Sequence, residues 1–383
     1  MGKPSKRIAR NWTFSGPCRR AIDGKIKCVQ AHASTPPNAP IGVIDSVGRG
    51  FETVVTHIGL ISLPLLLDIF LWLGPQLSVA PLIAEVGVLL EVQLRSSDIP
   101  DEMYETVQNT LVDIGESLNV FGLLSTAPLG VPSMMVASGS GGTPLGSELR
   151  IPVTSGASLF GLTVGLSVAG LFLGALFFGL IARQVLPAAE RWSDEQFLEL
   201  LLSHWLRLIG FAGAVLLAML LFGFLMAMLS ALLSMLHTVL GGMATSLAIA
   251  FWIWALFFVA FTMHGVVMHN RGLLPALRNS LRLVRWNMPA VTGLFVLIIV
   301  LSWGLGFLWS LPPGDSWLLL AGITAHAFVA TGVVAATFHF YQDRLRWCDE
   351  IQYALVERNR RAQNVGRTES SEVNKSGASK KDD

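Results

Sequence analysis

The chain has 383 residues, of which 52% are hydrophobic and 14% are charged, with a formal net charge of +1. A soluble domain carries about 25% charged residues, so this composition argues against an ordinary water-soluble protein. Nucleic-acid binding is also disfavoured, because that function needs a basic domain with aromatic side chains interleaved among the charges. The small net charge conceals an uneven distribution of basic residues, which bears on orientation.

Six apolar runs follow a basic N-terminal segment. Residues 1–40 are rich in Gly, Pro and Ser and are expected to form a disordered cytoplasmic N-terminus. We expect a membrane domain over 41–347 and a charged cytoplasmic tail over 348–383. A helix needs about 20 apolar residues to cross a bilayer core of about 30 Å. The runs that qualify are 54–73, 157–182, 208–233, 239–267, 291–311 and 317–340. The sequence therefore predicts an all-α polytopic integral membrane protein with six transmembrane helices.

The first run contains a single charged residue, Asp68. A carboxylate within a span costs about 2.5–3.5 kcal/mol on insertion scales, and such a group therefore usually faces protein or water. One interpretation is that Asp68 lines a polar path or holds a cation. The leading interpretation is that it lies near the outer end of the span, one turn before Trp72, where it reaches water or bonds a neighbouring helix.

Residues 74–156 form the one long segment outside the apolar runs of the membrane domain, and they carry nine acidic residues. Residues 79–94 are apolar with two embedded glutamates, which indicates an amphipathic or re-entrant helix. Apolar residues recur at helical spacing over 101–120, which predicts a second helix. The apolar stretch 121–136 is broken by two prolines and a glycine, and we expect it at the outer membrane interface. The sequence thus predicts a helical extracytoplasmic insert between spans 1 and 2.

The basic residues set the orientation. Of the 27 lysines and arginines, 25 lie in residues 1–53, 183–207, 268–290 and 341–383. Connections that are rich in lysine and arginine stay in the cytoplasm. We therefore expect both termini to be cytoplasmic, which agrees with an even number of spans, and we expect the protein in the plasma (inner) membrane.

The segment 271–286 predicts a basic amphipathic helix at the cytoplasmic interface. At about 100° per residue, Arg278, Arg282 and Arg285 fall within about 40° of Arg271, and leucines together with Val284 occupy the adjacent face. Each charge near an anionic leaflet contributes about 1 kcal/mol of attraction. The stripe is either a site for a phospholipid headgroup or an acidic partner, or only a topology signal and surface anchor.

Two histidines accompany Asp68 as polar groups inside predicted spans: His264 and His326, the second in the middle of the last run. The chain contains neither an HExxH nor a GxSxG pattern, so neither a zinc protease nor a serine hydrolase is supported. We predict no catalytic residues, no metal site and no cofactor. The ordinary role for the two histidines is interhelical hydrogen bonding.

Two short motifs resemble a known family. The segment PALRNSLRLVRWN at 275–287 and the segment FHFYQDRLRW at 338–347, with Tyr341, Asp343, Arg344 and Arg346, are similar to uncharacterised bacterial six-span proteins. Those proteins resemble the membrane domain attached to some glycerophosphodiester phosphodiesterases. The resemblance implies an all-helical membrane module without an established activity of its own. The soluble phosphodiesterase domain has no counterpart in this sequence, and the insert 74–156 departs from the pattern.

These observations predict a multi-pass, non-enzymatic plasma-membrane protein of scaffold, accessory or lipid-interacting type. Its expected partners are membrane lipids or another membrane protein, and not nucleic acid. The alternative is a small transporter or permease subunit with a polar path near Asp68, His264 and His326. A transporter of that kind needs polar residues that meet at mid-bilayer, and broken helices.

Overall fold

The computed structural model describes residues 40–95, 101–126, 128–138, 142–146 and 149–379. The predicted disordered segment 1–40 lies outside the described residues except for Pro40. The chain divides into two units, residues 41–345 and a second unit that combines 1–40 with 346–383. In the second unit, the described residues continue helix α12 (Leu319–Ser379). The fold below is that of residues 41–345.

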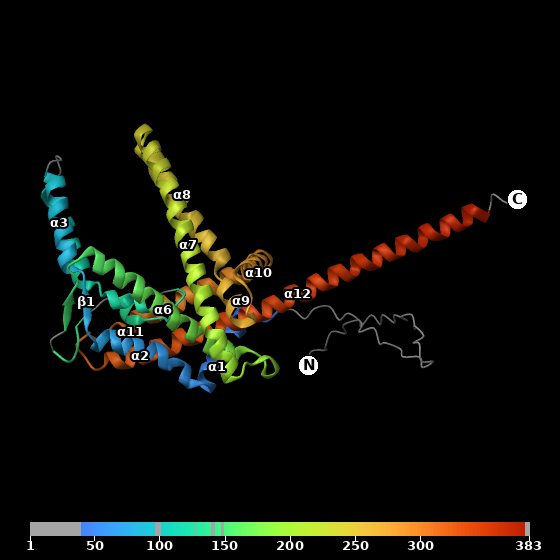
Figure 1. Ribbon diagram of the computed structural model, residues 1–383, viewed down its shortest axis with the longest axis horizontal. Coiled ribbons are helices and arrows are strands. Elements are labelled where there is room, and N and C mark those ends of the chain that lie inside the picture. Colours follow the sequence, from blue (N-terminus) through green and yellow to red (C-terminus); the bar gives the residue numbers. More distant parts are fainter. Residues whose placement is uncertain (1–39, 96–100, 127, 139–141, 147–148, 380–383) are drawn as a thin grey trace, which may run out of the picture. The chain divides into compact units, whose positions relative to one another are not determined.

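Helices make up almost all of the regular structure in the described residues (Figure 1). Five are long and apolar enough to cross a membrane: α6 (Gly156–Val185), α7 (Asp194–Leu236), α8 (Thr238–Val259) with α9 (Thr262–His269), α11 (Met288–Trp309) and the first part of α12. A sixth crossing exists only if the bent pair that begins the domain is counted as one span. The all-α polytopic fold is therefore confirmed, with five or six spans.

The first predicted span, 54–73, is not one straight helix. Helix α1 (Val43–Thr56) ends before His57, and after it η1 (Ile58–Ile61) leads into α2 (Ser62–Leu73), with a bend of 96° at the break. Pro64 lies in the first turn of α2, where its missing N–H is tolerated. A straight helix through this point would place the Pro64 ring against the carbonyl of Leu60, so the chain bends upstream of the proline.

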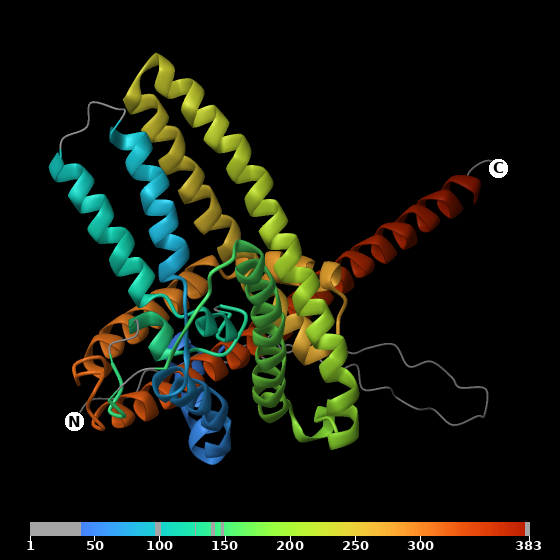
Figure 2. The same ribbon diagram turned by 60° about the vertical axis from the view of Figure 1, so that its left-hand side comes forward.

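A two-stranded parallel sheet closes the base of the insert. Strand β1 (Gln76–Ser78) pairs with β2 (Arg150–Pro152), with Leu77 opposite Ile151. The side chain of Asn119 accepts hydrogen bonds from the backbone N–H groups of Leu77 and Phe121, both at 3.1 Å. Helices α3 (Ala80–Arg95) and α4 (Asp101–Ser117) form an antiparallel hairpin that projects from this base, as predicted for two helices in the insert (Figure 2).

Part of the stretch 121–136 packs against α6, whereas Pro128 and Val136 are exposed, and its expected place at the outer membrane interface stays a prediction. It forms η2 (Val120–Leu124), a turn and the short helix α5 (Met134–Ser138), and its residue Val131 is fully buried. Two glycines of α6 make room for it. A Cβ atom on Gly174 would come within 2.3 Å of the Leu129 carbonyl oxygen, and one on Gly170 would meet the backbone of Leu123 at 2.6 Å. These two glycines therefore let the backbone of this stretch pack directly against α6.

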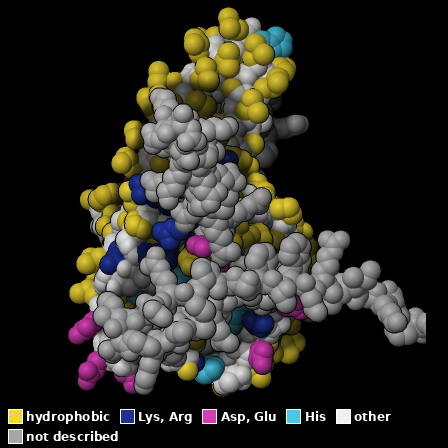
Figure 3. All heavy atoms as spheres, turned by 90° about the vertical axis from the view of Figure 1, so that its right-hand side faces the viewer, with side chains coloured by type: hydrophobic (Ala, Val, Ile, Leu, Met, Phe, Trp, Pro, Cys, Tyr) yellow, Lys and Arg dark blue, Asp and Glu magenta, His cyan; other side chains and the backbone are white. Residues whose placement is uncertain are grey.

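Helices α7 and α8 form a long hairpin that projects from the rest of the unit (Figure 1). A helix of 43 residues such as α7 is about 64 Å long, twice the thickness of a bilayer core. Ser193 begins it with a capping box, because its hydroxyl accepts from Gln196 N–H while the Gln196 side chain accepts from Ser193 N–H. Hydrophobic side chains cover the hairpin, and basic side chains gather below it (Figure 3).

Helix α1 crosses α12 at very short range, near Gly332 and Ala336. A Cβ atom on Gly50 would lie 2.4 Å from the carbonyl oxygen of Gly332 and 2.5 Å from the nitrogen of Ala336. The chain just before α1 is tied to the same helix, because Ile41 N–H donates to Asp343 at 3.0 Å and the Ile41 carbonyl accepts from Arg344 at 2.7 Å. Small residues at a helix crossing permit this approach.

The crossing predicts a strong difference between two neighbouring glycines of α1. Gly50→Ala is expected to destabilise the protein by about 1–3 kcal/mol, because the added methyl group overlaps the α12 backbone. The matched control is Gly48→Ala, since a Cβ atom on Gly48 meets nothing within 4 Å. The measurement is the apparent melting temperature of each detergent-purified variant. Equal melting temperatures for the two variants would contradict the crossing.

Candidate functional site

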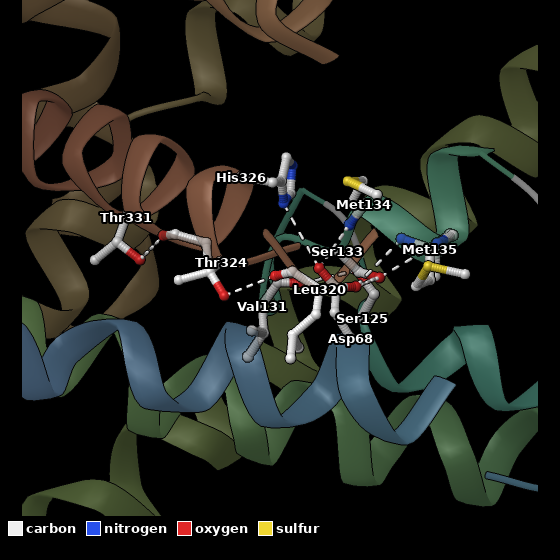
Figure 4. Close-up of polar contacts among 12 residues, drawn as sticks. Asp68, Ser125, Val131, Ser133, Met134, Met135, Leu320, Thr324, His326 and Thr331 are labelled. Carbon is white, nitrogen blue, oxygen red and sulfur yellow. Dashed lines mark hydrogen bonds and ion pairs between the residues drawn. The ribbon is translucent and has the colours of Figure 1, made fainter. Parts of the chain in front are cut away.

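The carboxylate of Asp68 is fully buried and accepts hydrogen bonds from the insert (Figure 4). Its oxygens accept from the hydroxyl of Ser133, from Met134 N–H at 3.0 Å and from Met135 N–H at 3.2 Å. Hydrogen bonds to a charged acceptor contribute about 1.5–3 kcal/mol each, so three of them offset much of the cost of burying the charge. Asp68 does not reach water, and its partners lie on the insert as well as on a neighbouring span.

These contacts arise where helix α5 begins. The first N–H groups of any helix lack an intrahelical acceptor and carry a partial positive charge. In α5, Ser133 caps one of them, because its hydroxyl accepts from Val136 N–H at 3.2 Å while it donates to Asp68. Asp68, which lies on helix α2, accepts hydrogen bonds from two more of these N–H groups. A carboxylate on one helix therefore completes the N-terminus of another.

His326 of α12 approaches the same carboxylate. Its Nδ1 lies 3.6 Å from an Asp68 oxygen, which is ion-pair distance but too long for a hydrogen bond. The loop between α11 and α12 is held in place by Trp72, whose indole N–H donates to the Gly314 carbonyl at 2.7 Å. Trp72 also packs edge-on against Trp317, with ring centroids 5.7 Å apart. The end of α2 thus positions the start of α12, and with it His326.

The His326 side chain retains 20% of its accessible surface, unlike Asp68. It lines a groove of about 730 Å³, a volume in the range of small-molecule sites. The walls come from α5, from the C-terminal half of α11, from the loop that precedes α12 and from the first part of α12. They include Met134, Met135, Trp303, Phe307 and Leu319, so the groove is mainly apolar with one imidazole at its edge.

His264 does not join this pair. Its Nε2 lies 2.8 Å from the Thr337 hydroxyl, and its ring packs against Phe338 with centroids 4.4 Å apart. Thr337 follows His326 by eleven residues, which is about 16 Å along one helix. The three polar residues named together in the sequence analysis therefore divide into one pair and one separate histidine.

The arginine segment forms helix α10 (Leu273–Trp286), which has three faces rather than two. Ala276, Ser280, Leu283 and Val284 are buried against the bundle. Leu274 and Leu281 are 59% and 41% exposed. Arg278 and Arg285 are exposed, whereas Arg282 and Arg271, which precedes the helix, are half-buried. Val284 thus belongs to the core and not to the face formed by the leucines.

The motif residues of the family resemblance have structural contacts. The buried Ser280 hydroxyl donates to the Phe258 carbonyl at 2.7 Å and accepts from Phe261 N–H at 3.2 Å, which bridges the break between α8 and α9. Asn287 donates to the Leu283 carbonyl at the end of α10, at 3.1 Å. Asp343 and Arg344 hold Ile41, as described above. These side chains satisfy backbone groups that broken or ending helices leave open.

No protein-family model, curated protein or solved structure matches the chain. The resemblance to the six-span membrane module therefore stays a prediction. Within the residues that the structure describes, no group of three or more His, Cys, Asp and Glu side chains could hold a metal ion.

Sequence reasoning missed Ser133 and the start of α5 as partners of Asp68. A local signal was present, because Pro132 and Ser133 precede the apolar residues Met134, Met135 and Val136, and this order is typical of a helix N-terminus. What the sequence lacked was any indication that the missing acceptor would come from residue 68. That contact spans more than 60 positions of the chain.

Asp68 is expected to be important for stability. Asp68→Leu leaves one hydroxyl and two buried N–H groups without an acceptor and should cost about 3 kcal/mol, whereas Asp68→Asn should cost less because an amide oxygen still accepts. At about 2–4 °C per kcal/mol, the apparent melting temperature of the leucine variant should fall by roughly 10 °C. Asp315→Asn, at an exposed site in the α11–α12 loop, is the control. Unchanged melting of the leucine variant would disprove the role of Asp68.

Proposed function

We propose that this chain is a non-enzymatic, lipid-interacting protein of the plasma membrane, with both termini in the cytoplasm. In this proposal helix α10 lies along the cytoplasmic interface. It acts as a scaffold element whose arginines bind the phosphates of anionic lipids or an acidic surface of another membrane protein. The observation that carries the proposal is the order of the three faces of α10.

That order suits a membrane interface. One face of α10 is buried in the protein, the next presents exposed leucines, and the third presents arginines. A helix parallel to the membrane needs apolar side chains toward the hydrocarbon and cationic side chains at the level of the headgroups. Leu274 and Leu281 would enter the acyl region, while Arg278 and Arg285 would reach phosphate oxygens, to which a guanidinium binds with two hydrogen bonds.

A neighbouring arginine supports the geometry of this helix. Arg207 of α7 donates to the Asn270 side chain at 2.6 Å and to the Arg271 carbonyl at 3.2 Å. Asn270 ends α9 in the left-handed conformation, with φ of 48°. The turn into α10 is therefore fastened to α7, and the direction of the arginine face is held by the bundle.

The alternative function, a small transporter or permease subunit, is favoured by one observation. Asp68 and His326 come within 3.6 Å of each other beside a broken first span, and ionisable pairs inside a membrane domain often mark proton or ion paths. Against it, three protein donors already occupy the Asp68 carboxylate, and His264 lies elsewhere. We therefore place lipid interaction first.

The lipid proposal predicts weaker binding of anionic lipid after charge removal on α10. The double variant Arg278→Gln with Arg285→Gln should lower the affinity for dioleoylphosphatidylglycerol by up to about 30-fold, because each of the two lost charges contributes about 1 kcal/mol of attraction. Native mass spectrometry of the detergent-purified protein, titrated with that lipid, provides the measurement.

The matched control replaces the same two residues by lysine, which keeps the charge but not the two-pronged hydrogen bonding. Full binding by the lysine variant indicates attraction by charge, and loss of binding indicates recognition of the phosphate group. Binding by the glutamine variant equal to that of the wild type would refute the proposed role of α10.

The proposed orientation predicts which positions are reached from outside the cell. In a variant without its native cysteines, a cysteine placed at Asn109 of α4 should react with an impermeant maleimide in intact cells. A cysteine at Arg278 should react only after the membrane is opened. Both positions are exposed in the folded chain, so protein burial does not confound the comparison. The reverse pattern of labelling would invert the orientation.

A further inference from the structure

The groove beside His326 differs from the arginine face in both place and chemistry. It lies between α5 and the end of α11 that joins the loop to α12, whereas the arginines belong to α10 at the opposite end of α11. Its lining residues are Met134, Met135, Ala137, Ser302, Trp303, Gly306, Phe307, Ser310, Pro312, Gly314, Leu319 and His326. As far as the structure describes the chain, this lining includes neither lysine nor arginine.

The groove opens onto an apolar surface. Trp303 and Phe307 lie on α11, a helix that is apolar enough to span a membrane, and they are 80% and 72% exposed. In a bilayer, exposed side chains of such a helix meet lipid hydrocarbon. Met134 and Met135, in contrast, are 2% and 8% exposed and form part of the inner wall. An acyl chain can therefore pass from the bilayer into the groove along Trp303 and Phe307.

The polar edge of the groove restricts the headgroup. Among the described residues, His326 is the only lining side chain with an ionisable group, and the Asp68 carboxylate lies behind it at 3.6 Å. A phosphate or carboxylate placed there would meet no lysine or arginine of the lining and would lie near a buried negative charge. A hydroxyl group carries no charge, and it can either donate to an imidazole nitrogen or accept from one.

We propose that this groove binds an uncharged, hydroxyl-bearing lipid of the diacylglycerol type. One acyl chain lies along Trp303 and Phe307, and the hydroxyl group hydrogen-bonds to His326. Asp68 holds the α5 wall in place through its three hydrogen bonds and lies beside the imidazole. This site is independent of the arginine face of α10.

Gly306 offers a way to block the groove without disturbing the fold. It lines the groove on α11, and a Cβ atom built on it meets nothing within 4 Å. Gly306→Leu should therefore fill the space that the lipid needs. Gly304→Leu is the matched control, because Gly304 has equally open surroundings on the same helix but does not line the groove.

The test titrates the detergent-purified full chain with dioleoylglycerol and records bound lipid by native mass spectrometry. We expect the wild type and Gly304→Leu to bind dioleoylglycerol alike, and Gly306→Leu to bind it at least 10-fold more weakly. His326→Leu should lose most of the preference for dioleoylglycerol over methyl oleate. Arg278→Gln with Arg285→Gln should bind dioleoylglycerol as the wild type does. This keeps failure of the groove distinct from failure of the α10 proposal.

Two results would overturn the inference. Equal binding by the Gly304 and Gly306 variants would mean that the lipid does not occupy the groove. Tighter binding of dioleoylphosphatidylglycerol than of dioleoylglycerol, with the same loss in Gly306→Leu, would mean that the groove selects an anionic headgroup. Melting temperatures of all variants, measured alongside, ensure that only folded protein is compared.

Discussion

A carboxylate removed from water has to be matched by hydrogen-bond donors, and in this chain that requirement brings α2, α5 and α12 together. Asp68 lies on α2, its donors lie at the start of α5, and His326 lies on α12. Three segments that are distant in sequence thereby converge on one buried charge. Removal of the charge leaves donors unpaired on the other segments, and for this reason the three are coupled in energy as well as in space.

The same principle recurs at three other irregular points of this domain. Ser280 hydrogen-bonds to backbone groups at the break between α8 and α9, and Asn119 accepts from backbone N–H groups of β1 and η2. Trp72 donates to a backbone carbonyl in the loop before α12. In hydrocarbon an open backbone group costs several kcal/mol, so irregular backbone is tolerated only where protein supplies a partner. The polar side chains of the spans are thus largely committed to structure. That commitment is a reason to look for function at the surfaces, in the arginine face of α10 and in the groove beside His326.

The two proposed lipid contacts follow from different physics. On α10, exposed charge outside the hydrocarbon attracts the phosphates of anionic lipids over a distance of several ångström. In the groove, shape and apolar surface select the ligand, and a single imidazole sets its polarity. Elsewhere in the bundle, Gly50, Gly170 and Gly174 let backbones approach closely, because a Cβ atom at any of the three would overlap a neighbouring backbone.

The sequence by itself determined the helical class, the positions of the long spans and the amphipathic character of α10, because hydropathy and a repeat of about 3.6 residues are local properties. It also singled out Asp68 and His326, since any ionisable residue in an apolar run is conspicuous. Only the tertiary structure decided that these two meet, that His264 stands apart with Thr337, and that the backbone around Leu123 and Leu129 packs against α6. Each of these outcomes depends on a contact between segments that are far apart in the sequence, such as a helix N-terminus and its acceptor or a glycine and the backbone that packs on it. The spacing of residues along the chain does not identify the distant partner in such a contact.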